Sequence, residues 1–401
     1  MVEIYRAWRL MMSRLVPKLR FKEFSGEWEE KKLGKIGDII TGNTPKTNEA
    51  DNYGSEILFV SPADISENRY IYTTDKKLTP KGFLKTRVVK AKSILVVCIG
   101  STIGKVAQNT IECATNQQIN SIIPFKENCN DFIYSTLEKD AKKIKGMAGN
   151  HAVPIINKTA FSNILILLPK EQEEQQKIAN TLSSLDNLIE AQQRKVEALQ
   201  KHKKGLMQQL FPSEGANEPK LRFKEFSGEW EEKKLGDCLD YLQPTKYLVS
   251  NTDYNDKYKT PVLTAGKTFI LGYTNETNGI FKDNLPVIIF DDFTTATKYV
   301  DFPFKAKSSA MKILIAKDNI NIKFMYELLQ MIKYEVGNHE RHWISKFAIL
   351  DILIPTQKEQ QKIANTLSSL DNLIEAHQRK VEALKKHKKG LMQQMFVSKE
   401  S

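Results

Sequence analysis

Two long charged segments carry the clearest pattern of apolar and polar positions in the chain. From Ile178 onward, apolar residues recur at alternating spacings of four and three, which is the heptad pattern of a helix packed along a seam. Glutamates crowd the first turns and lysines the last, which suits a helix dipole. We therefore predict two long helices, over 169–211 and 355–397. The predicted seam residues are Ile178, Leu182, Leu185, Ile189, Val196 and Leu199 in the first helix and Ile363, Leu367, Leu370, Ile374, Val381 and Leu384 in the second.

The two helical segments belong to a larger internal repeat. PKLRFKEFSGEWEEKKLG at 17–34 recurs unchanged at 219–236, and residues 174–211 return at 359–396 with three substitutions in 38 positions. The chain thus follows one plan twice: a short arm, a variable block and a long helix. The predicted parts are an N-terminal extension (1–16), the first arm (17–34), the first variable block (35–168), the first helix (169–211), a linker with the second arm (212–236), the second variable block (237–354) and the second helix (355–397).

The two variable blocks share an order of motifs. ILVVCIGSTIGKVA from Ile94 aligns without gaps with VIIFDDFTTATKYV from Val287, and both lead from an apolar run into Ser, Thr or Gly and then a lysine. Two further matches follow in the same order: Phe132, Tyr134 and Leu137 with Phe324, Tyr326 and Leu329, and Gly149, Asn150 and His151 with Gly337, Asn338 and His339. We interpret the blocks as two diverged copies of one α/β domain.

A heptad seam that occurs twice can pair with its own copy about a local two-fold axis, although such a stripe also suits an ordinary bundle helix. The connector of about 25 residues could span roughly 80 Å, which leaves a parallel pair open. An antiparallel pair requires no such stretching, and we favour it. The predicted fold class is α+β: two α/β domains separated by two long antiparallel coiled-coil helices, with a pseudo-two-fold internal repeat.

Composition adds a charge argument. The 401 residues include 60 Lys and Arg against 48 Asp and Glu, for a net charge of +12, which favours a polyanionic partner such as nucleic acid. The first block (35–169) holds 17 basic and 12 acidic residues, whereas the second holds 14 of each. No apolar run is long enough for a membrane span, and arginines interrupt the N-terminal segment, so we expect no membrane association and a cytoplasmic location.

Motifs for catalysis or metal binding are weak. Gly100 to Lys105 imitates a phosphate-binding loop, but three residues separate its glycines and Val106 replaces the Ser or Thr that would meet Mg²⁺. His339 and His342 lack the zinc-binding helix spacing, and the four cysteines lack a C-x-x-C pair. Asp291 and Asp292 align with non-acidic residues of the other block. We therefore predict a binding protein with no catalytic residues and no metal.

Two different domains related by a two-fold axis would meet two different half-sites on DNA, separated by an unread gap. Basic side chains would contact phosphates, and polar ones would contact base edges, although each could instead be an ordinary solvated loop residue. The candidates in the first block are Thr44, Lys46, Ser101, Thr102, Lys105, Asn116, Gln117, Gln118, Asn150 and His151. Those in the second block are Lys246, Thr294, Thr295, Thr297, Lys298, Lys307, Ser308, Ser309, Asn338, His339 and Arg341.

The whole arrangement resembles the specificity subunit of a type I restriction-modification enzyme. The resemblance lies in EQQKIANTLSSLDNLIEA and its copy, in the apolar-Pro segments before them, and in the IGSTIGK and NQQI elements. It implies that 35–168 and 237–354 are target-recognition domains, each reading one half of a bipartite asymmetric DNA target. The helices would set the spacer and dock methyltransferase subunits.

The same resemblance implies the partners and cofactors. The partners would be double-stranded DNA, modification subunits that use S-adenosylmethionine to methylate adenine, and motor-nuclease subunits that use ATP and Mg²⁺. The chain itself would bind none of these cofactors and would not be the catalyst. Two alternatives differ in what the sequence allows. The recognition half of a single-chain restriction-methyltransferase needs an N-P-P-Y or D-P-P-Y motif that the chain lacks, whereas a coiled-coil adaptor that binds other proteins stays open.

Overall fold

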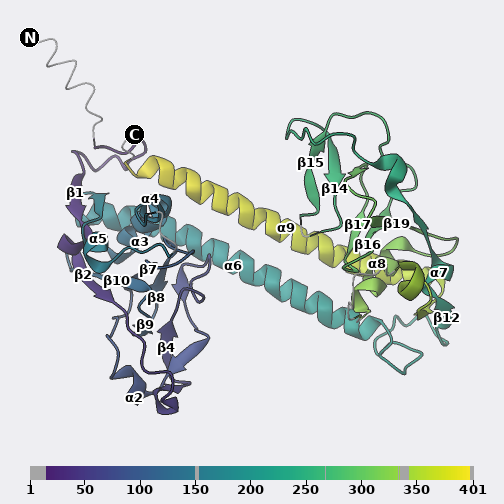
Figure 1. Ribbon diagram of the computed structural model, residues 1–401, viewed down its shortest axis with the longest axis horizontal. Helices are drawn as coiled ribbons and strands as arrows, with labels where there is room; N and C mark the ends of the chain where they lie inside the picture. The colour runs from purple at the N-terminus through teal and green to yellow at the C-terminus, as the bar shows by residue number, and fades with distance from the viewer. Residues whose placement is uncertain (1–14, 150–152, 267, 333, 335–342, 398–401) are drawn as a thin grey trace, which may run out of the picture. The chain divides into compact units, whose positions relative to one another are not determined.

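The computed structural model describes residues 15–149, 153–266, 268–332, 334 and 343–397. It divides into two compact units, which we call unit 1 (Met1–Arg194 with Gln378–Ser401) and unit 2 (Lys195–His377). Each unit mixes helices and strands (Figure 1), which confirms the prediction of a mixed fold with two domains and long helices. Among the described residues, no helix is both long and apolar enough to cross a membrane.

The two longest helices are α6 (Gln172–Leu210) and α9 (Gln357–Met395). Each runs through both units, so that unit 1 holds the start of α6 with the end of α9, and unit 2 holds the remainder of both. All twelve predicted seam residues are buried or half-buried. Burial of this stripe is what an amphipathic helix of such length needs, since intrinsic propensity alone gives marginal stability.

Unit 1 is built around a five-stranded sheet of order β2-β10-β7-β8-β5. Its central strand β7 has the sequence ILVV and is buried on both faces: Ile94 and Val96 join the core beneath α3, and Leu95 and Val97 join a second core on the opposite face. A four-stranded sheet of order β3-β6-β4-β9 lies beside it. The elements are β1 (Glu29–Lys32), η1 (Leu33–Lys35), β2 (Gly37–Thr41), η2 (Ala50–Asn52), β3 (Tyr53–Gly54), β4 (Ile57–Val60), β5 (Tyr70–Ile71), β6 (Lys76–Leu78), α2 (Pro80–Phe83), β7 (Ile94–Val97), β8 (Val106–Asn109), β9 (Ala114–Thr115), β10 (Ile119–Pro124), α3 (Asn130–Lys139), α4 (Ala141–Gly146), α5 (Lys158–Ser162) and β11 (Leu165–Leu168).

Unit 2 has a four-stranded sheet of order β13-β19-β16-β17, which matches the order β2-β10-β7-β8 of unit 1 strand for strand. The apolar run of β16 is again divided between two cores: Ile288 and Phe290 lie on one face, and Val287 and Ile289 on the other. A three-stranded sheet, β15-β14-β18, lies beside it. The elements are β12 (Glu231–Lys234), α7 (Leu235–Cys238), β13 (Leu239–Leu242), η3 (Pro244–Tyr247), β14 (Thr260–Leu263), β15 (Ile270–Thr274), β16 (Val287–Asp291), β17 (Thr297–Val300), β18 (Lys305–Ala306), β19 (Met311–Ala316), α8 (Ile322–Met331), η4 (Trp343–Phe347) and β20 (Asp351–Ile354).

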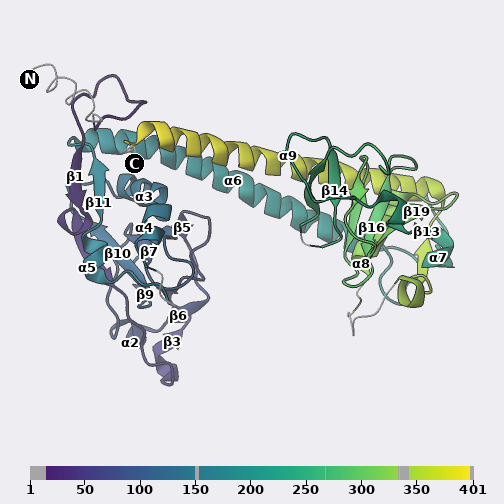
Figure 2. The same ribbon diagram turned by 45° about the horizontal axis from the view of Figure 1, so that its top comes forward.

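The two copies of the arm make equivalent contacts, each within its own unit. In unit 1 the arm forms β1, which pairs antiparallel with β11 (Figure 2), and Arg20 lies 2.7 Å from the buried carboxylate of Glu174 at the start of α6. In unit 2 the arm forms β12, which pairs with β20, and Arg222 lies 2.8 Å from Glu359 near the start of α9. Identical sequences therefore fix the start of each long helix in the same way.

A phenylalanine from the end of a long helix completes the core of each unit. In unit 1 the ring of Phe396, just after α9, lies 5.2 Å from Phe132 of α3 and 6.0 Å from Trp28 of the arm, between ring centroids. In unit 2 Phe211, just after α6, lies 5.3 Å from Phe324 and 6.2 Å from Trp230. Each variable block therefore closes over the end of a helix from the other half of the repeat.

We expect Phe396→Ala to lower the free energy of unfolding by about 3–5 kcal/mol, because it removes a buried ring and leaves a cavity between two aromatic side chains. Phe211→Ala should have an effect of the same size in unit 2. Thermal unfolding of the full chain measures both. Leu84→Ala is the matched control, since this leucine is 85% exposed. Equal unfolding temperatures for Phe396→Ala and Leu84→Ala would contradict the prediction.

Candidate nucleic-acid interface

In unit 1 the structure brings together three of the predicted segments: residues 42–46, the β7–β8 turn at 99–105, and residues 115–118. The hydroxyl of Thr44 donates a hydrogen bond of 2.6 Å to Gln117 Oε1, and Gln118 Nε2 donates one of 3.4 Å to the carbonyl of Ile99. Segments 42–46 and 115–118 approach each other closely, since a Cβ on Gly42 would lie 2.2 Å from Thr115 Oγ1. Thr44, Ser101 and Gln117 are exposed, so these loops form one polar surface.

The β7–β8 turn has a geometry of its own. Gly100 and Gly104 have φ angles of +97° and +91°, which favour glycine, and a Cβ on Gly104 would lie 2.5 Å from the carbonyl oxygen of Ala141. The turn leads into strand β8, whereas a phosphate-binding loop leads into a helix. Lys105 is exposed, and its Nζ donates 2.9 Å to the carbonyl of Ile65. Thr102 is half-buried in the same turn.

Two further residues of the first candidate set differ in exposure. Lys46 has a side chain that is 79% exposed and lies 3.8 Å from Glu49, so its charge faces solvent. Asn116 is half-buried, and its Nδ2 donates 3.0 Å to Gln118 Oε1. Lys46 therefore suits a phosphate contact, whereas Asn116 holds the shape of its own loop.

Arg87 is a basic residue of this surface that the sequence pattern did not identify. Asn43 Oδ1 accepts from the backbone N–H of Arg87 at 2.9 Å, and its Nδ2 donates to the carbonyl of Lys85 at the same distance. The guanidinium of Arg87 donates 2.7 Å to the carbonyl of Thr41, and the residue is exposed. No motif or periodicity marks Arg87, because the loop that it joins lies more than forty positions earlier.

In unit 2 the predicted residues 294–298 form the β16–β17 turn and the start of β17. Asp291 Oδ1 accepts from the backbone N–H groups of Phe293 and Thr294 at 2.9 and 3.2 Å, and Thr295 has a φ of +59°. Thr297 accepts a hydrogen bond from Gln330 of α8, and Lys298 is exposed. The turn therefore occupies the same place in its sheet as the β7–β8 turn does in unit 1.

The other candidates of unit 2 lie on neighbouring segments. The backbone N–H of Asp292 donates 3.2 Å to the carbonyl of Ala310, which brings the exposed Ser308 and Ser309 next to the β16–β17 turn. Lys307 follows β18, and Lys246 lies in η3, whose segment joins β18 through a bridge from Leu248 to Ala306. The predicted residues Asn150, His151, Asn338, His339 and Arg341 lie outside the described residues.

Asp291 and Asp292 do not form a paired acid site. Asp291 holds the turn, and Asp292 accepts 3.0 Å from the backbone N–H of Trp343 and lies 3.5 Å from the ammonium of Lys312. The Asp292 and Lys312 side chains are only 3% and 2% exposed. A carboxylate that is both buried and ion-paired serves the core of unit 2.

The cysteine thiols are poor nucleophiles near neutral pH. All four are free and buried, and burial raises the pKa of Cys98 to about 11 and that of Cys113 to about 12. Burial also raises the pKa of Cys129 and of Cys238. These thiols stay protonated near neutral pH, where only the thiolate is a strong nucleophile.

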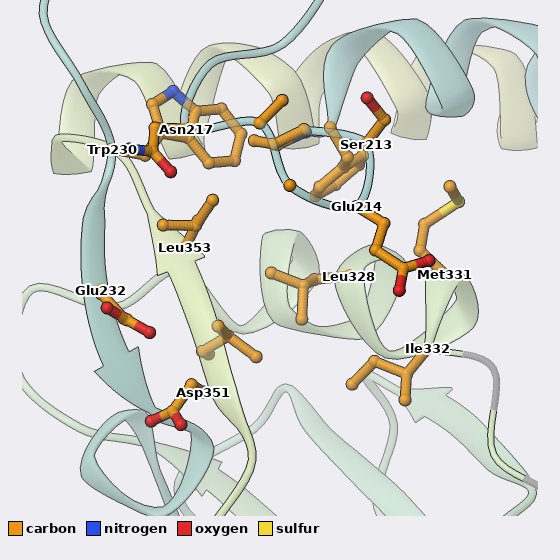
Figure 3. Close-up of a pocket in the computed structure, with 15 residues that line it drawn as sticks. Ser213, Glu214, Asn217, Trp230, Glu232, Leu328, Met331, Ile332, Asp351 and Leu353 are labelled. Carbon is orange, nitrogen blue, oxygen red and sulfur yellow. The ribbon is translucent and has the colours of Figure 1, made fainter.

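A pocket of about 370 Å³ lies in unit 2 between α8, β20 and the segment that follows α6 (Figure 3). Leu328, Met331 and Leu353 supply apolar walls, whereas Glu232 and Asp351 place carboxylates at its side. Carboxylates repel the phosphates of nucleic acid, so this pocket is a poor candidate for DNA contact.

Comparison with known proteins gives one consistent family. Residues 25–201 and 227–386 match the family model of the type I restriction modification DNA specificity domain. A match to the EcoR124I/EcoR124II specificity subunit of Escherichia coli is 54% identical over 133 residues and spans 32% of this chain and 33% of that protein. The MjaVIII specificity subunit of Methanocaldococcus jannaschii is 25% identical over 94% of this chain and 95% of its own length. The crystal structure of a type I S subunit from M. genitalium has a TM-score of 0.68 at 15% identity, covering 96% of this chain and 100% of that one, which is a likeness of fold.

Proposed function

The chain belongs to the type I restriction modification DNA specificity family, whose members are DNA-recognition components and not catalysts, and we propose that its two α/β domains each read one half of a bipartite, asymmetric DNA target. The observation that carries this proposal is the common strand order of the two sheets, which present different polar turns at the same place: GSTIGK in unit 1 and FTTATK in unit 2. A common frame with different contact residues suits two related readers of different sequences.

The long helices would act as an antiparallel spacer. In unit 1 Asp186 of α6 lies 2.6 Å from Lys388 of α9, and in unit 2 Lys203 of α6 lies 2.7 Å from Asp371 of α9. Moving forward along α6 therefore corresponds to moving backward along α9, which supports the antiparallel arrangement over the parallel one. With equivalent seams in both halves, the pair would carry the pseudo-two-fold repeat.

The helices would also dock the modification subunits. Leu188 of α6 and Leu373 of α9 occupy the same repeat position and are 51% and 42% exposed. Exposed leucines on otherwise polar helices suit a protein partner, and their repetition suits two copies of it. S-adenosylmethionine would be bound by those modification subunits, and ATP and Mg²⁺ by motor-nuclease subunits, in a cytoplasmic complex on double-stranded DNA. These leucines would equally suit a coiled-coil adaptor, which is the second candidate function.

The test is co-expression of the full chain with type I modification subunits, followed by sequencing that maps methylated adenines. We expect a complex that methylates one bipartite, asymmetric motif with a fixed gap. Modification subunits expressed without the chain are the control and should leave no such motif. A stable complex without any methylated motif would favour the adaptor, and the absence of both would overturn the proposal.

A further inference from the structure

In unit 2 a cluster of four charges joins the α/β domain to the long helices. Lys203 of α6 lies 2.7 Å from Asp371 of α9 and 2.9 Å from Glu327 of α8. Lys323 of α8 lies 2.8 Å from each of the same two carboxylates. The Glu327 side chain is fully buried, the two lysines are 15% and 14% exposed, and Asp371 is 36% exposed, so two cations balance two anions at the edge of the core.

In unit 1 the cluster has the same plan with different residues. Lys388 of α9 lies 2.6 Å from Asp186 of α6 and 2.6 Å from Glu138 of α3. Asp186 also pairs with a second cation, Arg69, whose guanidinium lies 3.1 Å from the Asp186 carboxylate. Arg69 comes just before β5 in the chain, and its side chain is only 2% exposed. Arg69 also lies 2.5 Å from Asp131 of α3.

The charges that the long helices α6 and α9 contribute, which we call helix-borne, are the same in both units. The charges that the α/β domains contribute differ between the units. Asp186 and Asp371 occupy one repeat position, and Lys388 and Lys203 another. In the aligned helices of the two domains, α8 carries Lys323 where α3 carries Asp131. Unit 1 thus has an acid where unit 2 has a base, and it obtains its cation from a distant strand edge.

The two cations nevertheless occupy equivalent sites. The guanidinium of Arg69 lies over the ring of Tyr134 at 4.5 Å, and the ammonium of Lys323 lies over the ring of Tyr326 at 4.9 Å. These tyrosines are aligned in the two helices. Burial lowers the pKa of both cations, but the neighbouring carboxylates raise it to a net value above the ordinary one, so both stay charged.

We propose that the helix-borne Asp–Lys pair is a docking socket common to both units, and that Arg69 and Lys323 are positioning residues that seat the two recognition domains on it. The docking socket is Asp186 with Lys388 in unit 1 and Asp371 with Lys203 in unit 2. It accepts any domain that offers a cation to the aspartate and an anion to the lysine. The reason is that a buried charge deprived of its partner is strongly unfavourable, whichever segment supplied the partner.

The structure of unit 2 supplies the test in unit 1. Arg69→Met should lower the unfolding temperature of the full chain by roughly 5–10 °C, because Asp131 and Asp186 lose their buried cation. Adding Asp131→Lys should recover at least half of that loss, since it places a lysine where unit 2 has Lys323. Asp131→Lys alone, with Arg69 present, should destabilise the chain. Arg69→Lys keeps a charge and should stay folded if Arg69→Met does not.

Lys81→Met is the matched control, because Lys81 and its partner Asp51 are 63% and 78% exposed, and such a surface pair should shift the unfolding temperature by no more than about 1 °C. If the double variant is no more stable than Arg69→Met, the docking socket is overturned. Its role in seating a DNA reader rests on the proposed function. The two proposals can fail separately. If the double variant regains stability but neither it nor the wild-type chain directs methylation of a bipartite motif, the proposed function is overturned and the docking socket is retained.

Discussion

Replacing residues 35–168 by the recognition domain of another type I specificity subunit is expected to change one half of the DNA target completely and to leave the other half unchanged. The loops that carry Thr44, Ser101 and Gln117 all lie in this block and contact one another within unit 1. Each wrong base pair costs about 1–3 kcal/mol of binding, so three or four changed pairs abolish methylation at the old half-site. Mapping of methylated adenines measures the result.

The incoming domain must also satisfy the docking socket. It should carry an anion at the position of Glu138 and a cation that reaches Asp186, or the chimera will be unstable for reasons unrelated to DNA reading. The reciprocal exchange of residues 237–354 is the control and should change the opposite half-site. If either exchange altered both halves of the target, independent reading by two domains would be wrong.

Lengthening both long helices at the boundary between the units should lengthen the unread gap by about two base pairs. Four residues inserted after Arg194 and four after His377 leave the described contacts within each unit untouched, because the units divide at these positions. The inserted turn adds about 6 Å along a helix, against about 3.4 Å for each base pair. Both half-sites should keep their sequences, and the methylation map should show the same motif with a longer gap.

A single insertion after Gln200 is the mismatched control. It shifts Lys203 along α6 while Asp371 and Glu327 stay in place, so it should destabilise unit 2 and lower methylation overall. A double insertion that changed a half-site sequence, or left the gap at its old length, would rule out the helices as the spacer.

The long helices were predictable because their heptad pattern extends over many turns and occurs twice. The buried strands β7 and β16 were equally recognisable in the sequence, because each is a short apolar run that ends in turn residues. Lys203, by contrast, is a polar residue within the apolar stripe. The structural role of Lys203 depends on its ion pair with Glu327, which lies more than a hundred residues away in the sequence, and no local pattern contains that contact.

The candidate interface was predictable only in part. The polar composition of the β7–β8 turn and of residues 116–118 predicts contact with DNA, and the structure brings both segments together with Thr44. Arg87 and Arg69 are single basic residues in irregular segments, so neither periodicity nor spacing distinguishes the exposed one from the buried one. Their difference arises from tertiary contacts: Arg87 donates to the carbonyl of Thr41 on the exposed loop surface, and Arg69 is buried against Asp186.

The placement of Phe396 in unit 1 has a consequence for how the chain folds during synthesis. Met392, Met395, Phe396 and Val397 belong to the core of the unit that contains the first variable block, so the domain made first receives these core residues only after all of unit 2 has been made. At about 5–20 residues per second, that delay is on the order of tens of seconds. Unit 2 is one continuous stretch and is complete sooner. The two α/β domains are thus completed in the reverse of the order in which they are made.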